Sequence, residues 1–314
     1  MARKNVTEQL PPTDEGIARA AEILARGGHV AVPTETVYGL AARADSADAV
    51  AGIYAAKGRP SFNPLIVHVK SVEQAQSYAH FNEQAHDLAQ RFWPGPLTLV
   101  LPMREEAGLA AAVSAGLPTI ALRQPAHSAM RALLEKLDFP LAAPSANRSE
   151  EVSPTKPEHV MTSLGEGVSA IICDGVTEAG LESTIVALRE DGGWTLLRPG
   201  PVTKEALEDI LGCETPAKTS KIEAPGQTSR HYSPGKPLRL NAREVAQDEF
   251  FIGFGSFEGD CSLSPEGDLL RAASQLYECL HLASASDKPR IAVAPIPHEG
   301  IGQAINDRLK RASG

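Results

Sequence analysis

The stretch from residue 27 to residue 68 constrains the fold of this chain more than any other. It begins with a short apolar run, His29 to Val32, which has the composition of a β-strand and is followed at once by Pro33. Proline has no amide hydrogen and a fixed φ, so the chain must leave a sheet there. The next polar residues are Thr34, Glu35, Thr36 and Tyr38. The sequence therefore predicts a strand that ends at a polar mouth.

Two strong cations follow this mouth, separated by one glycine. Lys57 ends a helix that is predicted to start near Ser46. Gly58 then occupies the place of a left-handed residue that stops a helix, and Arg59 follows it. The pair is either a solvated helix end or a phosphate clamp, because guanidinium binds phosphate through two hydrogen bonds and ammonium adds a compact charge. Arg123, at the end of another predicted strand, is either a phosphate or carboxylate ligand or a surface ion-pair partner.

A second apolar strand, Leu65 to Val69, carries His68. A packed core histidine is the more common fate of such a residue, and a binding role is the alternative. Glu35 and Glu182 are candidates for a general base or a metal ligand. Small polar groups gather again further along the chain, at Ser145, Asn147, Ser153, Ser183 and Thr184. These groups either surround a polar ligand or fill turns without one.

The size and charge of the chain limit the classes of protein to which it can belong. The chain has 314 residues, more than one domain usually holds, and 42% of them are hydrophobic, which suffices for proper cores. The formal net charge of -9 argues against a protein that holds duplex nucleic acid through an overall positive field. No stretch has the apolar length of a membrane helix, and the first residues lack the apolar region of a signal peptide. We therefore expect a cytoplasmic protein that has no membrane partner.

The four cysteines indicate neither a metal site nor a disulfide framework. Cys173, Cys213, Cys261 and Cys279 are far apart, with no C-x-x-C pair and no histidine at metal-ligand spacing. We expect reduced, mostly buried thiols, no disulfide bond and no metal held by protein ligands. The chain also has no P-loop motif, and the glycines of residues 253–259 have one residue too many between them for a dinucleotide loop.

The order of the predicted elements favours an α/β domain around a mixed, twisted sheet over residues 1–212. A doubly wound fold would need a helix between every pair of strands, and here strands outnumber helices. Helices are predicted at residues 14–26, 46–57, 71–93, 128–137 and 204–211. Strands are predicted at residues 29–32, 65–69, 97–102, 119–123, 141–143, 170–174, 183–188 and 194–198. The strand at 97–102 has no charge, so we expect it inside the sheet.

Hydrophobic periodicity stops over residues 213–236, where three prolines, two glycines and a local excess of lysine and arginine indicate a linker. The run Arg230 to Pro234 is unusual for a segment that only connects. Residues 237–314 then form a second, small domain. Its predicted strands at 250–255 and 290–294 and helices at 268–283 and 302–311 make a βαβα unit with a right-handed parallel crossover.

Several short motifs follow one another in this chain. They are Pro33-Thr-Glu-Thr-Val-Tyr-Gly-Leu, Lys57-Gly-Arg-Pro, Asn63-Pro-Leu-Ile-Val-His, Trp93-Pro-Gly-Pro-Leu-Thr, Ala143-Pro-Ser-Ala-Asn, Ser153-Pro-Thr, Glu182-Ser-Thr-Ile and Leu197-Arg-Pro-Gly-Pro. In this order they resemble the YrdC-like threonylcarbamoyl-adenylate synthases. His231-Tyr-Ser-Pro and Gly300-Ile-Gly-Gln-Ala-Ile-Asn-Asp-Arg are similar to the longer members, which add a linker and a small Rossmann-like domain. The similarity covers almost the whole chain from about Asp14.

The resemblance implies an L-threonylcarbamoyladenylate synthase, a nucleotidyltransferase whose N-terminal YrdC-like domain is catalytic. Such an enzyme makes threonylcarbamoyl-AMP and pyrophosphate from L-threonine, bicarbonate or CO2, and ATP. Mg2+ accompanies the ATP, and no organic cofactor is needed. The product serves threonylcarbamoyladenosine modification of tRNA beside the anticodon through a separate transferase. The implied partners are therefore that transferase machinery and, transiently, tRNA.

The resemblance also assigns roles to residues through the motifs. L-threonine would be held by Thr34, His68, Arg123 and Ser183, with Arg123 on the carboxylate. ATP and the developing charge would be held by Lys57, Arg59, Thr119, Ser145, Asn147, Ser153, Arg198 and Tyr232. Lys57 and Arg59 would be catalytic, and Tyr232 would belong to a lid that keeps water from the labile adenylate. The departures from the family pattern are Ala41, Glu150 and Ser233, and Glu150 would oppose phosphate binding unless it points to solvent.

Two other functions stay open at this point. One is a module that binds double-stranded RNA or tRNA without catalysis, which the negative net charge disfavours. The other is carbamoyl transfer from carbamoyl phosphate without ATP. A requirement for both ATP and threonine in pyrophosphate release would separate the synthase from both alternatives.

Overall fold

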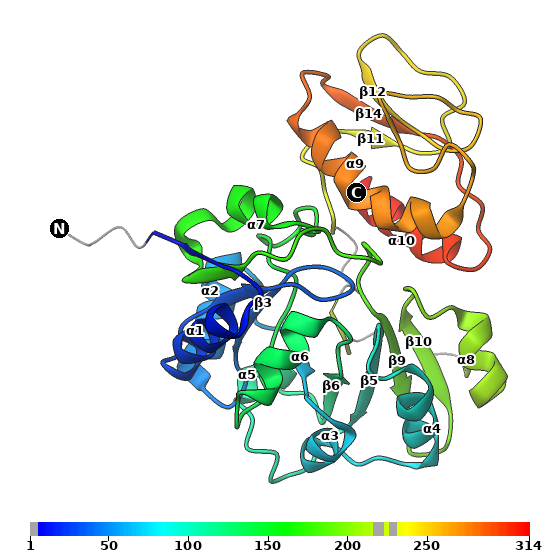
Figure 1. Ribbon diagram of the computed structural model, residues 1–314. Helices are drawn as coiled ribbons and strands as arrows, with labels where there is room; N and C mark the ends of the chain where they lie inside the picture. The colour runs from blue at the N-terminus through cyan, green and yellow to red at the C-terminus, as the bar shows by residue number, and fades with distance from the viewer. Residues whose placement is uncertain (1–5, 216–222, 226–230) are drawn as a thin grey trace.

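The computed structural model describes residues 6–215, 223–225 and 231–314, which form two sheets with their own helices (Figure 1). The larger sheet has ten strands in the order β1-β8-β2-β3-β7-β4-β6-β5-β9-β10. They are β1 (Glu8–Leu10), β2 (Val30–Val32), β3 (Gly39–Arg43), β4 (Ile66–His68), β5 (Leu97–Pro102), β6 (Thr119–Arg123), β7 (Leu141–Ala142), β8 (Ala170–Ile172), β9 (Thr184–Leu188) and β10 (Trp194–Arg198). Neighbours pair both ways, β4 with β6 in parallel and β2 with β3 antiparallel. The predicted mixed sheet is confirmed.

Helices cover both faces of the large sheet. They are α1 (Asp14–Ala25), α2 (Ala47–Lys57), α3 (Val72–Tyr78), α4 (Glu83–Phe92), α5 (Ala111–Ser114), α6 (Ser128–Glu135), α7 (Pro157–Leu164) and α8 (Lys204–Leu211), with a 3-10 turn at Gly165–Gly167. Val30 and Val32 pack in one apolar cluster with α1 and α6, whereas Ala31 between them packs in another with α2 and α4. Side chains alternate along a strand, so one short strand reaches both layers.

Helix α2 forms as the sequence predicts. Ser46 caps its first turn by accepting from the Ala49 amide, and Gly58 ends it with a φ of 59°. That left-handed residue turns the chain aside after Lys57. The strand β5 also lies inside the sheet as expected, between β6 and β9.

The single helix predicted over residues 71–93 is wrong, because the chain forms α3 and α4 there. Ala79 is extended and pairs with Met103, and Asn82 starts the second helix by accepting from the Ala85 amide. The apolar spacing continues across the break since both helices contribute to the same cluster. The elements β1, β3, α5 and α7 were not predicted. Of these, β3 returns antiparallel to β2 and places Gly39 beside Val32.

The C-terminal part forms a separate four-stranded sheet in the order β11-β14-β12-β13. Its strands β11 (Leu238–Arg239), β12 (Glu249–Gly253), β13 (Cys261–Ser262) and β14 (Arg290–Val293) pair in parallel. The pairing of β12 with β14 confirms the predicted parallel pair, whereas β11 and β13 were not predicted and the hand of the crossover stays a prediction. The helices α9 (Leu269–Ala285) and α10 (Gly302–Ala312) lie between this sheet and the large domain (Figure 1). Within the described ranges, no helix has both the length and the apolar character to cross a bilayer.

An apolar cluster joins the two parts of the molecule. Val37, Val152 and Leu181 of the large domain pack with the buried residues of α9 and α10. At Gly180 the fit is so close that an added Cβ would lie 2.6 Å from the backbone of Ser274 on α9. Only glycine permits this approach, because the φ of 64° at Gly180 also disfavours other residues.

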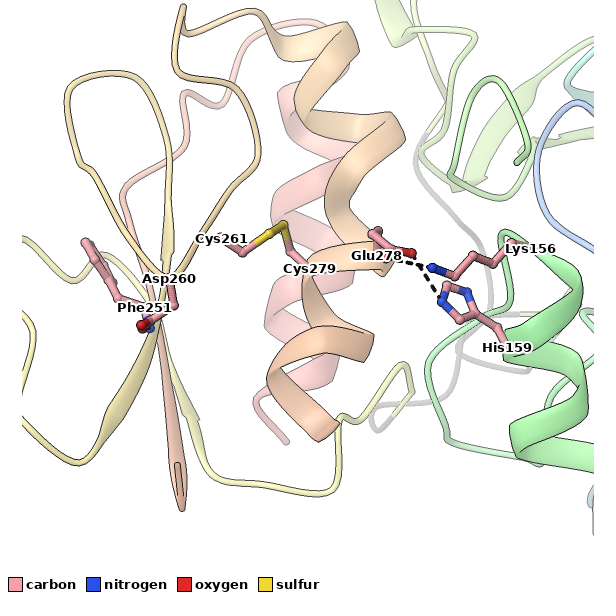
Figure 2. Close-up of a disulfide and its surroundings, with 7 residues drawn as sticks. All are labelled: Lys156, His159, Phe251, Asp260, Cys261, Glu278 and Cys279. Carbon is pink, nitrogen blue, oxygen red and sulfur yellow. Dashed lines mark hydrogen bonds and ion pairs between the residues drawn. A yellow bond between two sulfur atoms is a disulfide. The ribbon is translucent and has the colours of Figure 1, made fainter. Parts of the chain in front are cut away.

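The expectation that all cysteines are reduced is wrong for one pair. Cys261 of β13 and Cys279 of α9 form a disulfide, with 5.9 Å between their Cα atoms (Figure 2). The spacing of cysteines in the sequence could not reveal it, since 18 residues separate them and only the packing of α9 on the small sheet brings them together. Cys173 is half-buried and Cys213 exposed, and both are free thiols.

We expect the disulfide to stabilise the C-terminal part. A cross-link that closes a loop of this length restricts the unfolded chain and contributes about 3 kcal/mol in the loop-entropy model. Urea unfolding of the wild type with and without reductant measures the difference in unfolding free energy. In a Cys261→Ser, Cys279→Ser double variant, the unfolding free energy should be the same with and without reductant. Titration of the unfolded, unreduced protein should find only the thiols of Cys173 and Cys213, and four reactive thiols would contradict the bond.

Candidate active site

A cavity lies where several strands of the large sheet end. The carboxyl ends of β4, β6 and β10 form its floor, and the turns after β2 and β7 form its sides. The segment before β9 and two linker residues, Pro225 and His231, complete the wall. Of the residues assigned from sequence, those that line it are Thr34, Arg59, His68, Arg123, Ser145, Ser183 and Arg198. The polar mouth predicted after Pro33 is therefore part of a real cavity.

Arg123 lies opposite His68, because β4 and β6 pair in parallel register at their ends. Its Nη2 donates to Glu35 Oε1 over 2.5 Å, its Nη1 donates to Thr36 Oγ1 over 3.0 Å, and its Nε donates to the Gly95 carbonyl. Burial acts to raise the pKa of Glu35, but the charge and hydrogen bond of Arg123 outweigh it and the pKa is lowered. The guanidinium is thus fixed in a buried ion pair, with two of its five N–H groups outside these three bonds.

His68 is 2% exposed, and it nevertheless borders the cavity. Burial and the positive charge of Arg123 lower the pKa of His68 to about 3, so the ring is neutral at physiological pH. Its Nδ1 has no hydrogen-bond partner among the described residues. A buried polar atom of this kind is a group that a ligand can satisfy.

Lys57 is buried beneath the turn after β7. Its Nζ donates to the carbonyls of Ser145, at 2.6 Å, and of Asn147. Burial and the neighbouring charge of Arg59 hold the pKa of Lys57 well below its usual range. The two motifs, Lys57-Gly-Arg and Ser145-Ala-Asn, are 88 residues apart in the chain and come together at this one contact.

Arg59 lines the cavity from the loop after α2. Its Nε donates to the Asn63 carbonyl at 3.3 Å and its Nη2 to the Pro64 carbonyl at 2.9 Å. Burial lowers the pKa of Arg59 to about 10, so the side chain keeps its charge at neutral pH. No carboxylate among the described residues forms an ion pair with Arg59, which leaves its charge available to an anion in the cavity. Lys57 is held by the two carbonyls and does not line the cavity.

Arg198 and Ser183 also line the cavity. Arg198 donates from Nε to the Ser183 carbonyl at 3.0 Å and from Nη2 to Ser183 Oγ at 3.1 Å. Ser183 also shares a hydrogen bond of 2.7 Å with Thr98 of β5. Gly200 makes this packing possible, since an added Cβ would lie 2.5 Å from the Thr184 amide nitrogen.

Neither of the two candidate general bases is suited to that role. Glu35 is tied to Arg123, and Glu182 accepts hydrogen bonds from Ser153, Tyr277 and Arg308. Burial acts to raise the pKa of Glu182, but Arg308 and Arg198 bring it down to about 2, which makes the group a weak base. Within the described residues, no group of three or more His, Cys, Asp or Glu side chains is arranged to hold a metal ion.

The assigned residues that do not line the cavity are Lys57, Thr119, Asn147, Ser153 and Tyr232. Asn147 and Ser153 are buried behind its wall, where Asn147 donates to backbone carbonyls and Ser153 to Glu182. Thr119 lies at the far end of β6 from Arg123, although alternation places both on the same face of the strand. Glu182, a candidate base from the sequence, also lines the cavity. The lining residues to which the sequence reasoning assigned no role are Thr36, Val37, Gly39, Ile66, Ala143, Pro144, Pro225 and His231, and all but Pro225 stand inside the quoted motifs.

Two described parts of the linker, around Ala224 and around Tyr232, lie against the site. Ala224 is completely buried in an apolar cluster with Ile66 and Ala121, so the linker covers the face that Thr119 shares with Arg123. Tyr232 is also buried, and it adopts a left-handed φ of 63°. The side-chain atoms His231 Nδ1 and Tyr232 OH have no hydrogen-bond partner among the described residues. Arg230 of the same motif lies outside them.

Glu150, the departure that would oppose an anion, is exposed and has a left-handed φ of 71°. Its carbonyl accepts from the Ser233 amide at 2.7 Å. Glu150 and Ser233, two departures from the family pattern, therefore contact each other. Glu150 is exposed and does not line the cavity.

Comparison with known proteins places this site in a family. A family model described as Telomere recombination, for Sua5, YciO and YrdC proteins, matches residues 22–200, and the model for the C-terminal domain of threonylcarbamoyl-AMP synthase matches residues 202–314. The chain therefore belongs to the Sua5/YciO/YrdC family.

Relatives match over nearly their full length. The threonylcarbamoyl-AMP synthase of Bacillus subtilis (strain 168) is 38% identical over 335 residues, covering 99% of this chain and 96% of that protein. The protein of the same name from Pyrococcus abyssi (strain GE5 / Orsay) is 37% identical over 321 residues, covering 94% and 93%. The crystal structure of P. abyssi Sua5 complexed with L-threonine has a TM-score of 0.89 and 35% identity, covering 98% of each chain.

The buried His68 should make stability depend on pH. Its pKa of about 3 in the folded protein lies below the ordinary value of 6.5, so the unfolded chain takes up the proton first as pH falls. Between pH 6.5 and pH 5, the wild type should lose about 1.5 kcal/mol more unfolding free energy than a His68→Asn variant. Urea titrations at both pH values measure this, with the exposed His80→Asn as control. Equal losses in the wild type and His68→Asn would contradict a buried neutral ring.

Proposed function

We propose that this chain is an L-threonylcarbamoyladenylate synthase. It joins L-threonine, bicarbonate or CO2, and ATP into threonylcarbamoyl-AMP and pyrophosphate, for threonylcarbamoyladenosine modification of tRNA. The observation that carries the proposal is the gathering of Arg59, Arg123 and Arg198 around one cavity between hydroxyl-bearing turns. Two anions, a carbamate and a triphosphate, need cations between them in order to approach.

We propose that L-threonine binds at the end of the cavity formed by β4 and β6. Arg123 offers its remaining N–H groups to the carboxylate, and Thr34, His68 and Ser183 surround the rest of the molecule. The ion pair with Glu35 fixes the guanidinium in advance, which lowers the entropy cost of binding. The P. abyssi relative crystallised with L-threonine supports this assignment.

For ATP we propose the cationic side of the cavity and the sheet face beyond it. Lys57, Arg59 and Arg198 meet the phosphates, with Ser145, Asn147 and Ser153 supporting their turns. Thr119 lies further along the face that carries Arg123, at a place for the nucleoside. Magnesium enters as part of the ATP substrate, held by phosphate oxygens, because the two nearby carboxylates are committed to arginines.

The reaction requires alignment rather than a protein nucleophile. A carbamate formed on the amine of threonine attacks the α-phosphorus, and pyrophosphate leaves with the electron pair of the broken bond. Lys57 and Arg59 act as catalytic residues by stabilising the charge that develops on the phosphate oxygens. A neutral His68 and a water-poor cavity keep the carbamate from protonation and loss of CO2.

We propose three parts for the chain, with the catalytic domain over 1–212, a linker over 213–236 and the small Rossmann-like domain over 237–314. The linker acts as a lid, since its segment from Tyr232 is buried against the site and Ala224 covers the nucleotide face. The product passes to a separate transferase, with tRNA as a transient partner, and these steps belong to the cytoplasm.

Loss of either cation of the clamp should abolish most activity. One charge-assisted phosphate contact contributes about 2 to 4 kcal/mol in the transition state, so Lys57→Ala and Arg59→Ala should each slow adenylate formation by about two orders of magnitude. Pyrophosphate release and mass-spectrometric detection of threonylcarbamoyl-AMP measure it, with Lys204→Ala on the surface of α8 as control. Near-normal turnover of both variants would refute the clamp. Product formed from carbamoyl phosphate without ATP, or salt-dependent RNA binding without any turnover, would favour the alternative functions.

Removal of the Tyr232 ring should let water reach the bound adenylate. We expect Tyr232→Ala to consume ATP while releasing more free AMP relative to threonylcarbamoyl-AMP, because water then reaches the adenylate. Chromatographic quantitation of both nucleotides gives the ratio. An unchanged ratio would show that this part of the linker does not protect the product.

A further inference from the structure

A negative charge lines the cavity where an ATP site needs positive charge. Glu182 precedes β9 and borders the cavity beside Arg198. A carboxylate and phosphate groups repel each other, most strongly where water is scarce. The chemistry proposed above makes no use of this carboxylate. If Arg198 is to bind phosphate, the charge of Glu182 has to be balanced from outside the cavity.

Three donors hold the Glu182 carboxylate. Ser153 donates to Oε1 at 2.5 Å, while Oε2 accepts from the Tyr277 hydroxyl at 2.7 Å and from Arg308 Nε at 2.9 Å. Tyr277 lies on α9 and Arg308 on α10, the two helices that face the large domain (Figure 1). The C-terminal domain therefore supplies two of these three donors and one full positive charge.

Arg308 is built into the interface between the domains. Its side chain is 0% exposed, and its Nη1 donates to Asp307 at 2.9 Å. The guanidinium carbon lies 5.3 Å from the ring centroid of Tyr232. A buried guanidinium is costly unless it is partnered, so Glu182, Asp307 and the Tyr232 ring together fix its place. One arginine thus contacts both the cavity wall and the linker.

We propose that Arg308 is a positioning residue of the synthase: it neutralises Glu182 and holds that carboxylate on the C-terminal domain, so that Arg198 is free to bind phosphate. The inference rests on the proposed use of ATP. Arg308 does not line the cavity in the described part of the chain, and it acts through Glu182. Without it, the unpaired carboxylate would repel the triphosphate and compete for Arg198. The small domain is then part of the nucleotide site, although it contributes no phosphate ligand.

The test is a double-mutant cycle read out by nucleotide binding. Arg308→Met keeps the apolar volume but leaves Glu182 unpaired, and it should weaken binding of α,β-methylene-ATP about tenfold or more. Glu182→Gln removes the repelling charge and should bind the analogue as well as the wild type or more tightly. The combined variant should recover to within about threefold of Glu182→Gln, a rescue that a purely structural role would not give. Calorimetry measures affinity, and steady-state kinetics should show KM for ATP rising more than kcat falls.

Arg290→Met serves as the matched control, since it removes an exposed arginine of the same domain whose partner is Asp248. Wild-type affinity in Arg308→Met, or a double variant as weak as Arg308→Met, would overturn the proposal. If Arg308→Met does not fold, Glu182→Gln decides alone, because weakened nucleotide binding there would make Glu182 a ligand and refute the repulsion. A wild type that binds the analogue but forms no threonylcarbamoyl-AMP would instead refute the proposed function.

Discussion

Buried positive charge is the constraint on which this structure depends. Arg59, Arg123 and Arg198 line one cavity, and Lys57 is buried beneath the turn after β7. Each of these charges is costly to remove from water. The chain reduces that cost locally, with carbonyl groups at Lys57 and Arg59 and with carboxylates near the two others. Glu35 pairs directly with Arg123, and the charges of Arg308 and Arg198 lower the pKa of Glu182, which stays ionised near Arg198. The cavity therefore keeps cationic groups that can pair with a bound anion.

The positions of these charged side chains are set by the ends of the strands that carry them and by the turns that follow the strands. Parallel β4 and β6 bring His68 and Arg123 side by side, while the turn after β7 brings Ser145 over Lys57. Side chains at strand ends are held by a rigid sheet, yet they face an open edge rather than a packed layer. The sheet therefore buries the apolar clusters and also holds the polar groups at its edge. A ligand bound across that edge contacts residues of several motifs.

The interface between the domains extends this arrangement to the C-terminal end of the chain. Tyr232, Tyr277 and Arg308 form a buried cluster against Glu182, and an apolar seam around Leu181 surrounds it. Polar groups inside an apolar interface are satisfied only in one relative placement, so they make the docking of the two domains specific. The linker begins on one domain and its Tyr232 is packed by the other, so both domains hold it in place.

Local patterns in the sequence determined the class of fold, the helix from Ser46 to Gly58 with its caps, the parallel C-terminal unit and most of the cavity's polar groups. These depend on neighbours within a few residues or on motifs whose order is already in the chain. Tertiary structure alone decided the break between α3 and α4, the Cys261–Cys279 disulfide, the pairing of Arg123 with Glu35 and the reach of Arg308 to Glu182. Such contacts join residues far apart in the chain, and their free energy depends on packing and burial that no local pattern records.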